Sequence, residues 1–206
     1  MNFTVISDTH NKHGSLKLEG GDVLLHCGDF SGRGTEQQVF DFNTWLEQQD
    51  FKYKVVIAGN HDFLFEREPQ KAREILTAAI YLEDSSVEIE GIKIYGSPWQ
   101  PWFHNWAFNL HRGQPLAEKW ALIPEDTDIL LTHGPPLGIG DLTSRGEMVG
   151  CEDLLSRIRE IAPKYHCFGH IHEHSGMWSI EGTTHINASI CDLDYKPLNP
   201  FYTFEL

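Results

Sequence analysis

Cysteine is scarce in this sequence of 206 residues, and so are basic side chains. The cysteines form no C-x-x-C pair, so a disulfide scaffold and a thiolate metal finger are both excluded. We expect the thiols to be buried and free. The four cysteines are Cys27, Cys151, Cys167 and Cys191.

Long apolar runs are also absent, since none approaches the ~18 residues of a membrane span. A core-strand pattern starts as early as Phe3 and leaves no room for a signal peptide. We therefore expect a cytoplasmic protein without a membrane partner. There is no internal repeat and no linker, and a length of 206 residues suits a single domain covering residues 1–206.

Sixteen basic residues face thirty acidic ones, and the formal net charge is −14. A surface of that sign repels polyanions, which argues against binding to duplex nucleic acid. A phosphate substrate must therefore be attracted by local positive charge. The sequence leaves the oligomeric state open.

Five short apolar runs each end next to residues that can bind a metal ion. Runs rich in Val, Ile and Leu are typical of strands buried on both faces, and such strands place ligand sites at their carboxyl ends. One site built from five strand ends is the simplest interpretation. The runs are residues 3–7, 23–27, 55–58, 129–132 and 166–168.

Helical patterns alternate with these runs. Thr35 and Gln38 form a capping-box pattern that opens a helix, and further helices are predicted over residues 68–80 and 152–162. Residues 87–94 are typical of a hairpin. Additional strands are predicted at residues 184–188 and 201–204. This number of strands exceeds what a single sheet requires and favours two mixed sheets packed face to face between helical layers.

The residues that follow the five runs supply oxygen and nitrogen ligands without a thiolate. Such donors suit Mn, Fe, Zn, Co or Ni, and their number is large enough for two divalent ions if one carboxylate bridges them. Asp29 is the predicted bridge, and Mn is the ion expected to support activity. The predicted ligands are Asp8, His10, Asp29, Asn60, His133, His170 and His172.

Two such ions would hold a phosphoryl group and lower the pKa of a bound water to about 7, so that a metal-bound hydroxide can attack phosphorus. Two ions carry a charge of about +4 and the two aspartates −2, which leaves local positive charge for an anion. His61 adjoins Asn60 without being needed as a ligand. We assign it as proton donor to the leaving group, with Asp29 as the other catalytic residue.

In their order along the chain, these motifs resemble the signature of the calcineurin-like metallophosphoesterase superfamily. The similarity to its smaller metallophosphoesterase-domain-containing group, which is class III phosphodiesterase-like, extends over nearly the whole chain. The motifs are Asp8-x-His10, Gly28-Asp29, Gly59-Asn60-His61-Asp62, His133 and Gly169-His170-x-His172.

The resemblance implies an αββα four-layer sandwich and a division of the ligands between two metals. It implies one metal on Asp8, His10, Asp29 and His172, and the other on Asp29, Asn60, His133 and His170. Some members of the group have Gly at the position of His170, which is intact here.

One position departs from the superfamily's protein phosphatases, which carry Asp where this chain has Gly32. That Asp orients the catalytic histidine, so the departure argues against a protein phosphatase. It leaves Asp62 or a more distant acid as candidates to orient His61.

Residues 98–106 form a proline-broken stretch with three tryptophans. Aromatic faces stack nucleobases, so Trp102 and Trp106 are predicted substrate contacts, although a hydrophobic lid explains them equally well. His111 and Arg112 are weaker candidates for contact with phosphate, and Arg33 is interpreted as a solvated loop residue.

The sequence therefore predicts a metal-dependent phosphodiesterase that acts on small phosphodiesters, with cyclic nucleotides as candidates. A phosphomonoesterase with the same chemistry is the first alternative. A weakly active nucleotide-binding or scaffold protein is the second, and the complete ligand set argues against it.

Overall fold

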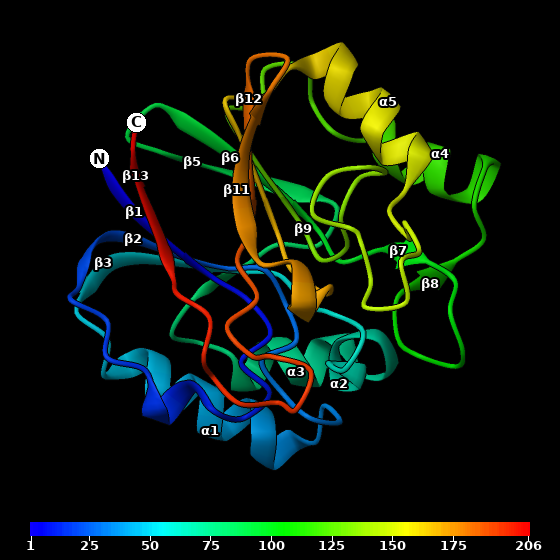
Figure 1. Ribbon diagram of the computed structural model, residues 1–206. Coiled ribbons are helices and arrows are strands. Elements are labelled where there is room, and N and C mark those ends of the chain that lie inside the picture. Colours follow the sequence, from blue (N-terminus) through cyan, green and yellow to red (C-terminus); the bar gives the residue numbers. More distant parts are fainter.

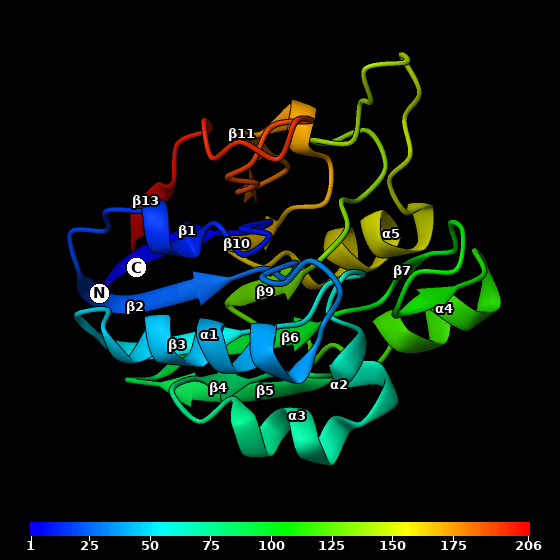
Figure 2. The same ribbon diagram turned by 90° about the horizontal axis from the view of Figure 1, so that it is seen from below.

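Apolar side chains along the central strands alternate between two layers of core. In β1 (Asn2–Ile6), Phe3 and Val5 enter the core between the two sheets, whereas Ile6 packs towards the helices. Leu25 and Leu24 of β2 (Gly21–His26) repeat this division. The computed structural model, which describes residues 1–206, is therefore built in four layers (Figures 1 and 2).

The first sheet is parallel except for one edge strand. β1 pairs in parallel with β2, and β13 pairs antiparallel with β1. Its strands in spatial order are β13 (Tyr202–Glu205), β1, β2, β3 (Phe51–Val56) and β4 (Ile80–Tyr81). Its outer face packs against α1 (Glu36–Glu47), α2 (Phe63–Arg67) and α3 (Pro69–Ile75).

The second sheet has a parallel centre and two antiparallel edges. In spatial order its strands are β11 (Gly176–Ile180), β12 (Thr183–Asn187), β10 (Tyr165–Phe168), β9 (Ile129–Thr132), β6 (Ile92–Ser97) and β5 (Ser85–Ile89). Its outer face packs against α4 (Gln114–Trp120) and α5 (Glu152–Ile161).

Short elements complete the chain. They are the two-stranded pair β7 (Gln100–Pro101) and β8 (Asn109–Leu110), and the 3₁₀ turns η1 (His13–Ser15) and η2 (His172–His174). No helix has both the length and the apolar character that crossing a membrane requires.

Most local predictions are confirmed. Thr35 and Gln38 form both hydrogen bonds of the capping box at the start of α1. The predicted third helix ends at Ile161, because Ala162 adopts the left-handed conformation at φ 45° before Pro163. The hairpin of β5 and β6 and the strands β12 and β13 lie where expected, and all four cysteines are free and buried. The αββα arrangement is confirmed as well.

The prediction of a helix over residues 68–80 is right at its start and wrong at its end. α3 begins at Pro69, in the first turn as expected, after Glu68, whose backbone at φ −136° and ψ 63° is not helical. The chain leaves α3 at Ile75, and Ile80 pairs with Val55 as part of β4. The helices α2 and α4 and the strand β11 were not predicted.

The parallel strands of both sheets point their carboxyl ends towards the same edge of the molecule. The two sheets meet at this edge, because Ser7 after β1 bridges to Ser189 after β12. The Ser7 N–H donates to the carbonyl of Ala188, and the Ile190 N–H donates to the carbonyl of Ser7. Loops from both sheets are thereby held together where the predicted ligands lie.

Candidate metal centre

The seven predicted ligands follow five strand ends from the two sheets. Asp8 and His10 follow β1, Asp29 follows β2, and Asn60 follows β3. From the second sheet, His133 follows β9, and His170 and His172 follow β10. Five of these residues are buried, and His170 and His172 are partly buried in the wall of a surface cavity.

Unusual backbone conformations turn these side chains inwards. Asp8, His10, Asp29 and His170 all have positive φ, between 41° and 70°. Non-glycine residues adopt this region infrequently, and such strain concentrates at functional sites.

Glycines next to the ligands allow the loops to approach one another. A β-carbon at Gly59 would lie 2.5 Å from the backbone nitrogen of Asp29, and one at Gly169 would collide with the Asp8 carboxylate. A β-carbon at Gly28, at φ 95°, would lie 2.7 Å from the Ala58 carbonyl oxygen. Any side chain at these positions would force the ligand loops apart.

A first cluster consists of Asp8, His10 and His172. The Nε2 atoms of His10 and His172 lie 3.2 Å apart, and His172 Nε2 lies 3.3 Å from Asp8 Oδ1. The other oxygen of Asp8 accepts from the backbone N–H of His170 and from Ser189 Oγ. Asp8 Oδ1 itself is buried without a hydrogen-bond partner.

A second cluster consists of Asp29, His133 and His170, with Asn60 beside it. His133 Nε2 lies 2.9 Å from Asn60 Oδ1 and 3.4 Å from Asp29 Oδ2. Asp29 Oδ2 also lies 3.7 Å from His10 Nε2, in the first cluster. Asp29 therefore stands between the two clusters.

Backbone carbonyls orient two of the histidines. His133 Nδ1 lies 2.9 Å from the carbonyl oxygen of Cys27, and His172 Nδ1 lies 3.0 Å from that of Asp192. A carbonyl can only accept, so Nδ1 carries the proton and Nε2 presents its lone pair to the cluster in the neutral ring. This is the arrangement that metal-ligating histidines adopt.

Burial and the carboxylates set the charge of the site. Burial lowers the pKa of His10 to about 4 and that of His170 to about 3, so both rings are neutral. Burial opposes protonation of His133 and His172 too, but the carboxylates of Asp29 and Asp8 raise the pKa of each to about 9. Without a cation, these two histidines hold protons next to the aspartates.

The donors fit divalent metal ions. Neutral imidazole, carboxylate and amide oxygen suit transition ions such as Mn, Fe, Zn, Co and Ni. Asp8 Oδ1 is a further indication, because this buried carboxylate oxygen accepts no hydrogen bond and has the His172 ring 3.3 Å away, where a cation would balance its charge. Each of the two clusters could hold a metal ion.

A family model for calcineurin-like phosphoesterases matches residues 1–174. The chain belongs to this family. Metallophosphoesterase domain-containing protein 1 of Homo sapiens is 44% identical over 229 residues, which cover 99% of this chain and 70% of that protein.

Two other matches are more distant. A probable cyclic nucleotide phosphodiesterase of Synechococcus is 27% identical over 143 residues, which cover 68% of this chain and 52% of that protein. A solved structure from Thermus thermophilus has a TM-score of 0.63 at 13% identity, covers 98% of this chain and 97% of its own, and shares the fold.

His61 lies beside both clusters of this calcineurin-like site. Its Nε2 lies 3.9 Å from Asp29 Oδ2, and its ring packs edge-on against His10 and stacks on Trp106. Its Nδ1 lies 2.8 Å from the carbonyl oxygen of Gly32. The residue that replaces the phosphatase Asp thus orients His61 through its backbone.

Asp62, which the sequence suggested as an acid that orients His61, contacts other groups. Its carboxylate accepts hydrogen bonds from the backbone N–H groups of Asp29, Ser31 and Gly59, and from the Ser31 hydroxyl. No hydrogen bond joins it to His61, so the suggestion that it orients His61 is wrong. Asp62 instead holds the loops that carry Asp29 and Asn60.

Two neighbouring cavities adjoin the candidate metal centre. The first, of about 180 Å³, lies over the clusters, and Asp29, His61, Trp106 and Tyr195 are among its walls. The second, of about 490 Å³, lies beside His170, and we call it the side chamber. Both are lined by Phe103, His170, Glu173 and Leu193, so the two cavities lie next to each other.

The predicted substrate contacts divide between these cavities. Trp106 lines the smaller one, and the Arg33 guanidinium lies over its ring at 4.9 Å while remaining exposed. Trp102 and Arg112 line the side chamber. Arg112 donates to the carbonyls of Val149 and Gly150, so part of its guanidinium anchors that loop. His111 is exposed, and its ring stacks on Trp102 at 6.1 Å.

Sequence reasoning missed Tyr195. It has positive φ, at 58°, and its ring packs edge-on against His10 and His172. It lies in an irregular segment after β12 with no apolar period and no motif. A cluster of turn residues, Asp192-Leu193-Asp194, is the only signal that precedes it.

Proposed function

We propose that this calcineurin-like protein is a dinuclear-metal phosphodiesterase that hydrolyses small phosphodiesters, with cyclic nucleotides as candidate substrates. The observation that carries the proposal is the meeting of two donor clusters at one carboxylate, Asp29, with His61 grouped beside His10 and Asp29.

In this proposal one ion binds to Asp8, His10, His172 and Asp29. The other binds to Asn60, His133, His170 and again Asp29, whose Oδ2 faces both groups. When bound, two such ions neutralise phosphoryl oxygens and lower the pKa of water at the site. The identity of the metals is part of the proposal, with Mn as the ion that supports activity.

His61 holds the proton that the leaving group takes. The Gly32 carbonyl keeps a proton on Nδ1, so the proton that moves is the one on Nε2, which faces the clusters. Stacking on Trp106 and contact with His10 restrict the ring to this direction. Leaving oxygens of high basicity depend most on such a donor.

Preference for diesters over monoesters has two supports. The relative from Synechococcus is described as a probable cyclic nucleotide phosphodiesterase. The aromatic walls formed by Phe103, Trp106 and Tyr195 also offer faces to a ring-bearing ester.

The proposal treats residues 1–206 as one catalytic unit, because both sheets contribute ligands. A reducing compartment such as the cytoplasm suits its four free, buried cysteines.

Metal analysis combined with a substrate panel tests the proposal. Protein purified without chelator is analysed for metals, stripped, reloaded with Mn, Fe, Zn, Co or Ni, and assayed on bis(p-nitrophenyl) phosphate and p-nitrophenyl phosphate. We expect two ions per chain and faster hydrolysis of the diester. Faster hydrolysis of the monoester would make the protein a phosphomonoesterase, and two bound ions without turnover would favour a binding or scaffold role.

A further inference from the structure

The side chamber lies beside the second donor cluster and away from His61. His170 of that cluster lines the chamber, whereas His61 lines only the smaller cavity. His61 instead contacts His10 of the first cluster. A phosphoryl group held over the clusters would therefore have His61 on one side and the chamber on another.

The chamber walls are mostly apolar. Pro101, Trp102, Phe103, Pro135, Val149 and Ile171 contribute apolar surface, and Trp102 is 54% exposed. The charged groups present are already engaged: Arg112 donates to two backbone carbonyls, and Glu173 Oε1 accepts from the Ser144 N–H at 2.8 Å. At about 490 Å³, the chamber falls in the ~300–1,000 Å³ range of pockets that enclose small organic ligands.

We infer that the side chamber holds the ester group that stays on phosphorus during hydrolysis, and that it selects diesters whose retained group carries an aromatic ring. This inference rests on the proposed function. It assigns the leaving group to the side of His61 and Trp106, and the retained group to Trp102 and Val149.

The reaction balances with this placement. The oxygen of water forms a bond to phosphorus, the bond from phosphorus to the leaving oxygen breaks, and that oxygen takes the proton from His61 Nε2. Of the two protons of the water, one stays on the phosphate of the product and the other restores His61 through solvent. The product is a monoester that keeps its organic group in the chamber, roughly perpendicular to the line of displacement.

A substrate series with one leaving group tests the assignment. Methyl p-nitrophenyl phosphate and phenyl p-nitrophenyl phosphate release the same phenolate and differ only in the retained group. We expect KM to be at least tenfold lower for the phenyl diester. Val149→Trp, which fills the chamber, should raise KM for the phenyl diester at least tenfold and change that for the methyl diester less than twofold.

The matched control is Met148→Trp. Met148 precedes Val149 in the same loop but is 65% exposed and does not line the chamber. The Met148→Trp substitution should leave both KM values unchanged. Equal effects of Val149→Trp on both diesters, with the melting temperature unchanged, would overturn the inference and leave the proposed function intact.

A binding measurement separates the inference from the proposed function. The Trp102 indole N–H signal, assigned with Trp102→Phe, is followed by NMR as phenylphosphonate or methylphosphonate is added to metal-loaded protein. We expect phenylphosphonate to shift this signal at lower concentration, and Val149→Trp to remove the difference. That shift without any turnover would contradict the proposed function alone. Identical curves for the two phosphonates would contradict the chamber assignment.

Discussion

Histidines of two kinds lie in β10 and just beyond its end. His166 lies within the strand, beneath α5, whereas His170 and His172 lie just beyond its end in the metal centre. Each ring nitrogen of His166 has a neutral partner: Nε2 lies 2.8 Å from Thr132 Oγ1, and Nδ1 lies 3.2 Å from His185 Nδ1. His172 has a carbonyl at Nδ1 but the Asp8 carboxylate beside Nε2.

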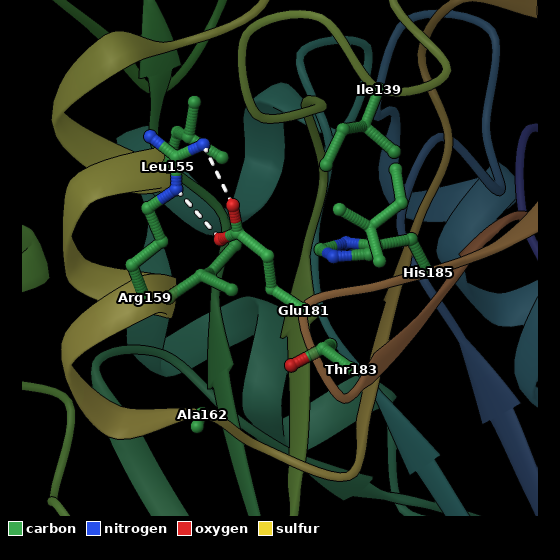
Figure 3. Close-up of a pocket in the computed structure, with 9 residues that line it drawn as sticks. Ile139, Leu155, Arg159, Ala162, Glu181, Thr183 and His185 are labelled. Atoms are coloured by element: carbon green, nitrogen blue, oxygen red, sulfur yellow. Dashed lines mark hydrogen bonds and ion pairs between the residues drawn. The ribbon is translucent and has the colours of Figure 1, made fainter.

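The region beneath α5 has no free donor set. His185 lines a cavity of about 40 Å³ there, and the charged neighbours Arg159 and Glu181 pair with each other at 2.8 Å (Figure 3). The comparison teaches that burial does not distinguish a ligand from a packing histidine. The two regions differ in charge at the second ring nitrogen: His166 has only neutral partners, whereas a carboxylate lies 3.3 Å from Nε2 of His172 and 3.4 Å from Nε2 of His133.

The largest effect is expected for Asp29→Asn, which removes the charge shared by the two clusters without changing the size of the side chain. Both ions should be lost together and diester hydrolysis should fall below detection, because the two clusters lose the carboxylate that they share. Elemental analysis and turnover measure this. As the control from the other region, His166→Gln should keep two ions per chain, and full metal occupancy in Asp29→Asn would disprove the bridge.

His61→Ala should keep both ions and lose roughly 10²- to 10⁴-fold in turnover, the usual contribution of a general acid. The loss should be greater for a nucleotide diester than for an aryl diester, because p-nitrophenolate departs without a proton. Metal content and kcat for the two substrates are compared. An equal loss for both, or the loss of an ion, would show that His61 binds phosphate or metal instead.

His166→Phe should lower the free energy of unfolding by about 1–3 kcal/mol, since the polar groups of Thr132 and His185 lose a buried partner. Metal content should stay at the wild-type level. Urea unfolding and elemental analysis of the same preparation measure this. A variant that is fully stable but depleted of metal would abolish the distinction between the two regions.

The smallest effects are changes in stability with pH, measured on protein treated with a chelator. The contribution of His172 to stability should fall as the pH rises, and that of His185 should fall as the pH drops. The pKa of His172 is raised to about 9, against 6.5 for an unperturbed histidine, because Asp8 outweighs the effect of burial. Its contribution to stability is therefore fully present below pH 6.5 and is lost as the pH rises through 9. The pKa of His185 is lowered by burial to about 4, so its neutral form is favoured and stability falls between pH 6.5 and 4.

Thermal unfolding of His172→Gln and His185→Gln from pH 4 to 10 checks these signs. The deficit of His172→Gln relative to wild type should shrink above pH 9, and His185→Gln should lose less stability than wild type on acidification. Parallel curves for both variants at every pH would mean that the two regions do not differ in protonation.

The positions of the predicted ligands could be read from local patterns. A buried strand shows itself as a short apolar run, and Gly28, Gly59 and Gly169 mark where loops approach too closely for a side chain. Parallel strands then bring their ends to one edge, so the set of ligand positions followed from the order of motifs.

Other features could not be predicted because they depend on contacts distant in sequence. The end of α3 at Ile75 needed the pairing of Ile80 with Val55, and an apolar helical period that continues to Ala79 concealed it. The orientation of His61 depends on the backbone carbonyl of Gly32. A pattern of side chains could show only that no carboxylate stands at this position.

The sequence by itself determined the αββα layers, the family and the set of candidate ligand residues, because strand periodicity, glycine sterics and ligand chemistry act over a few residues. Only the tertiary structure decided which carboxylate oxygen faces both clusters, what holds His61, and where Tyr195 and the side chamber lie. These features depend on loops from both sheets, which meet at the bridge between Ser7 and Ser189. The two residues are far apart in the sequence, so no local pattern encodes their contact.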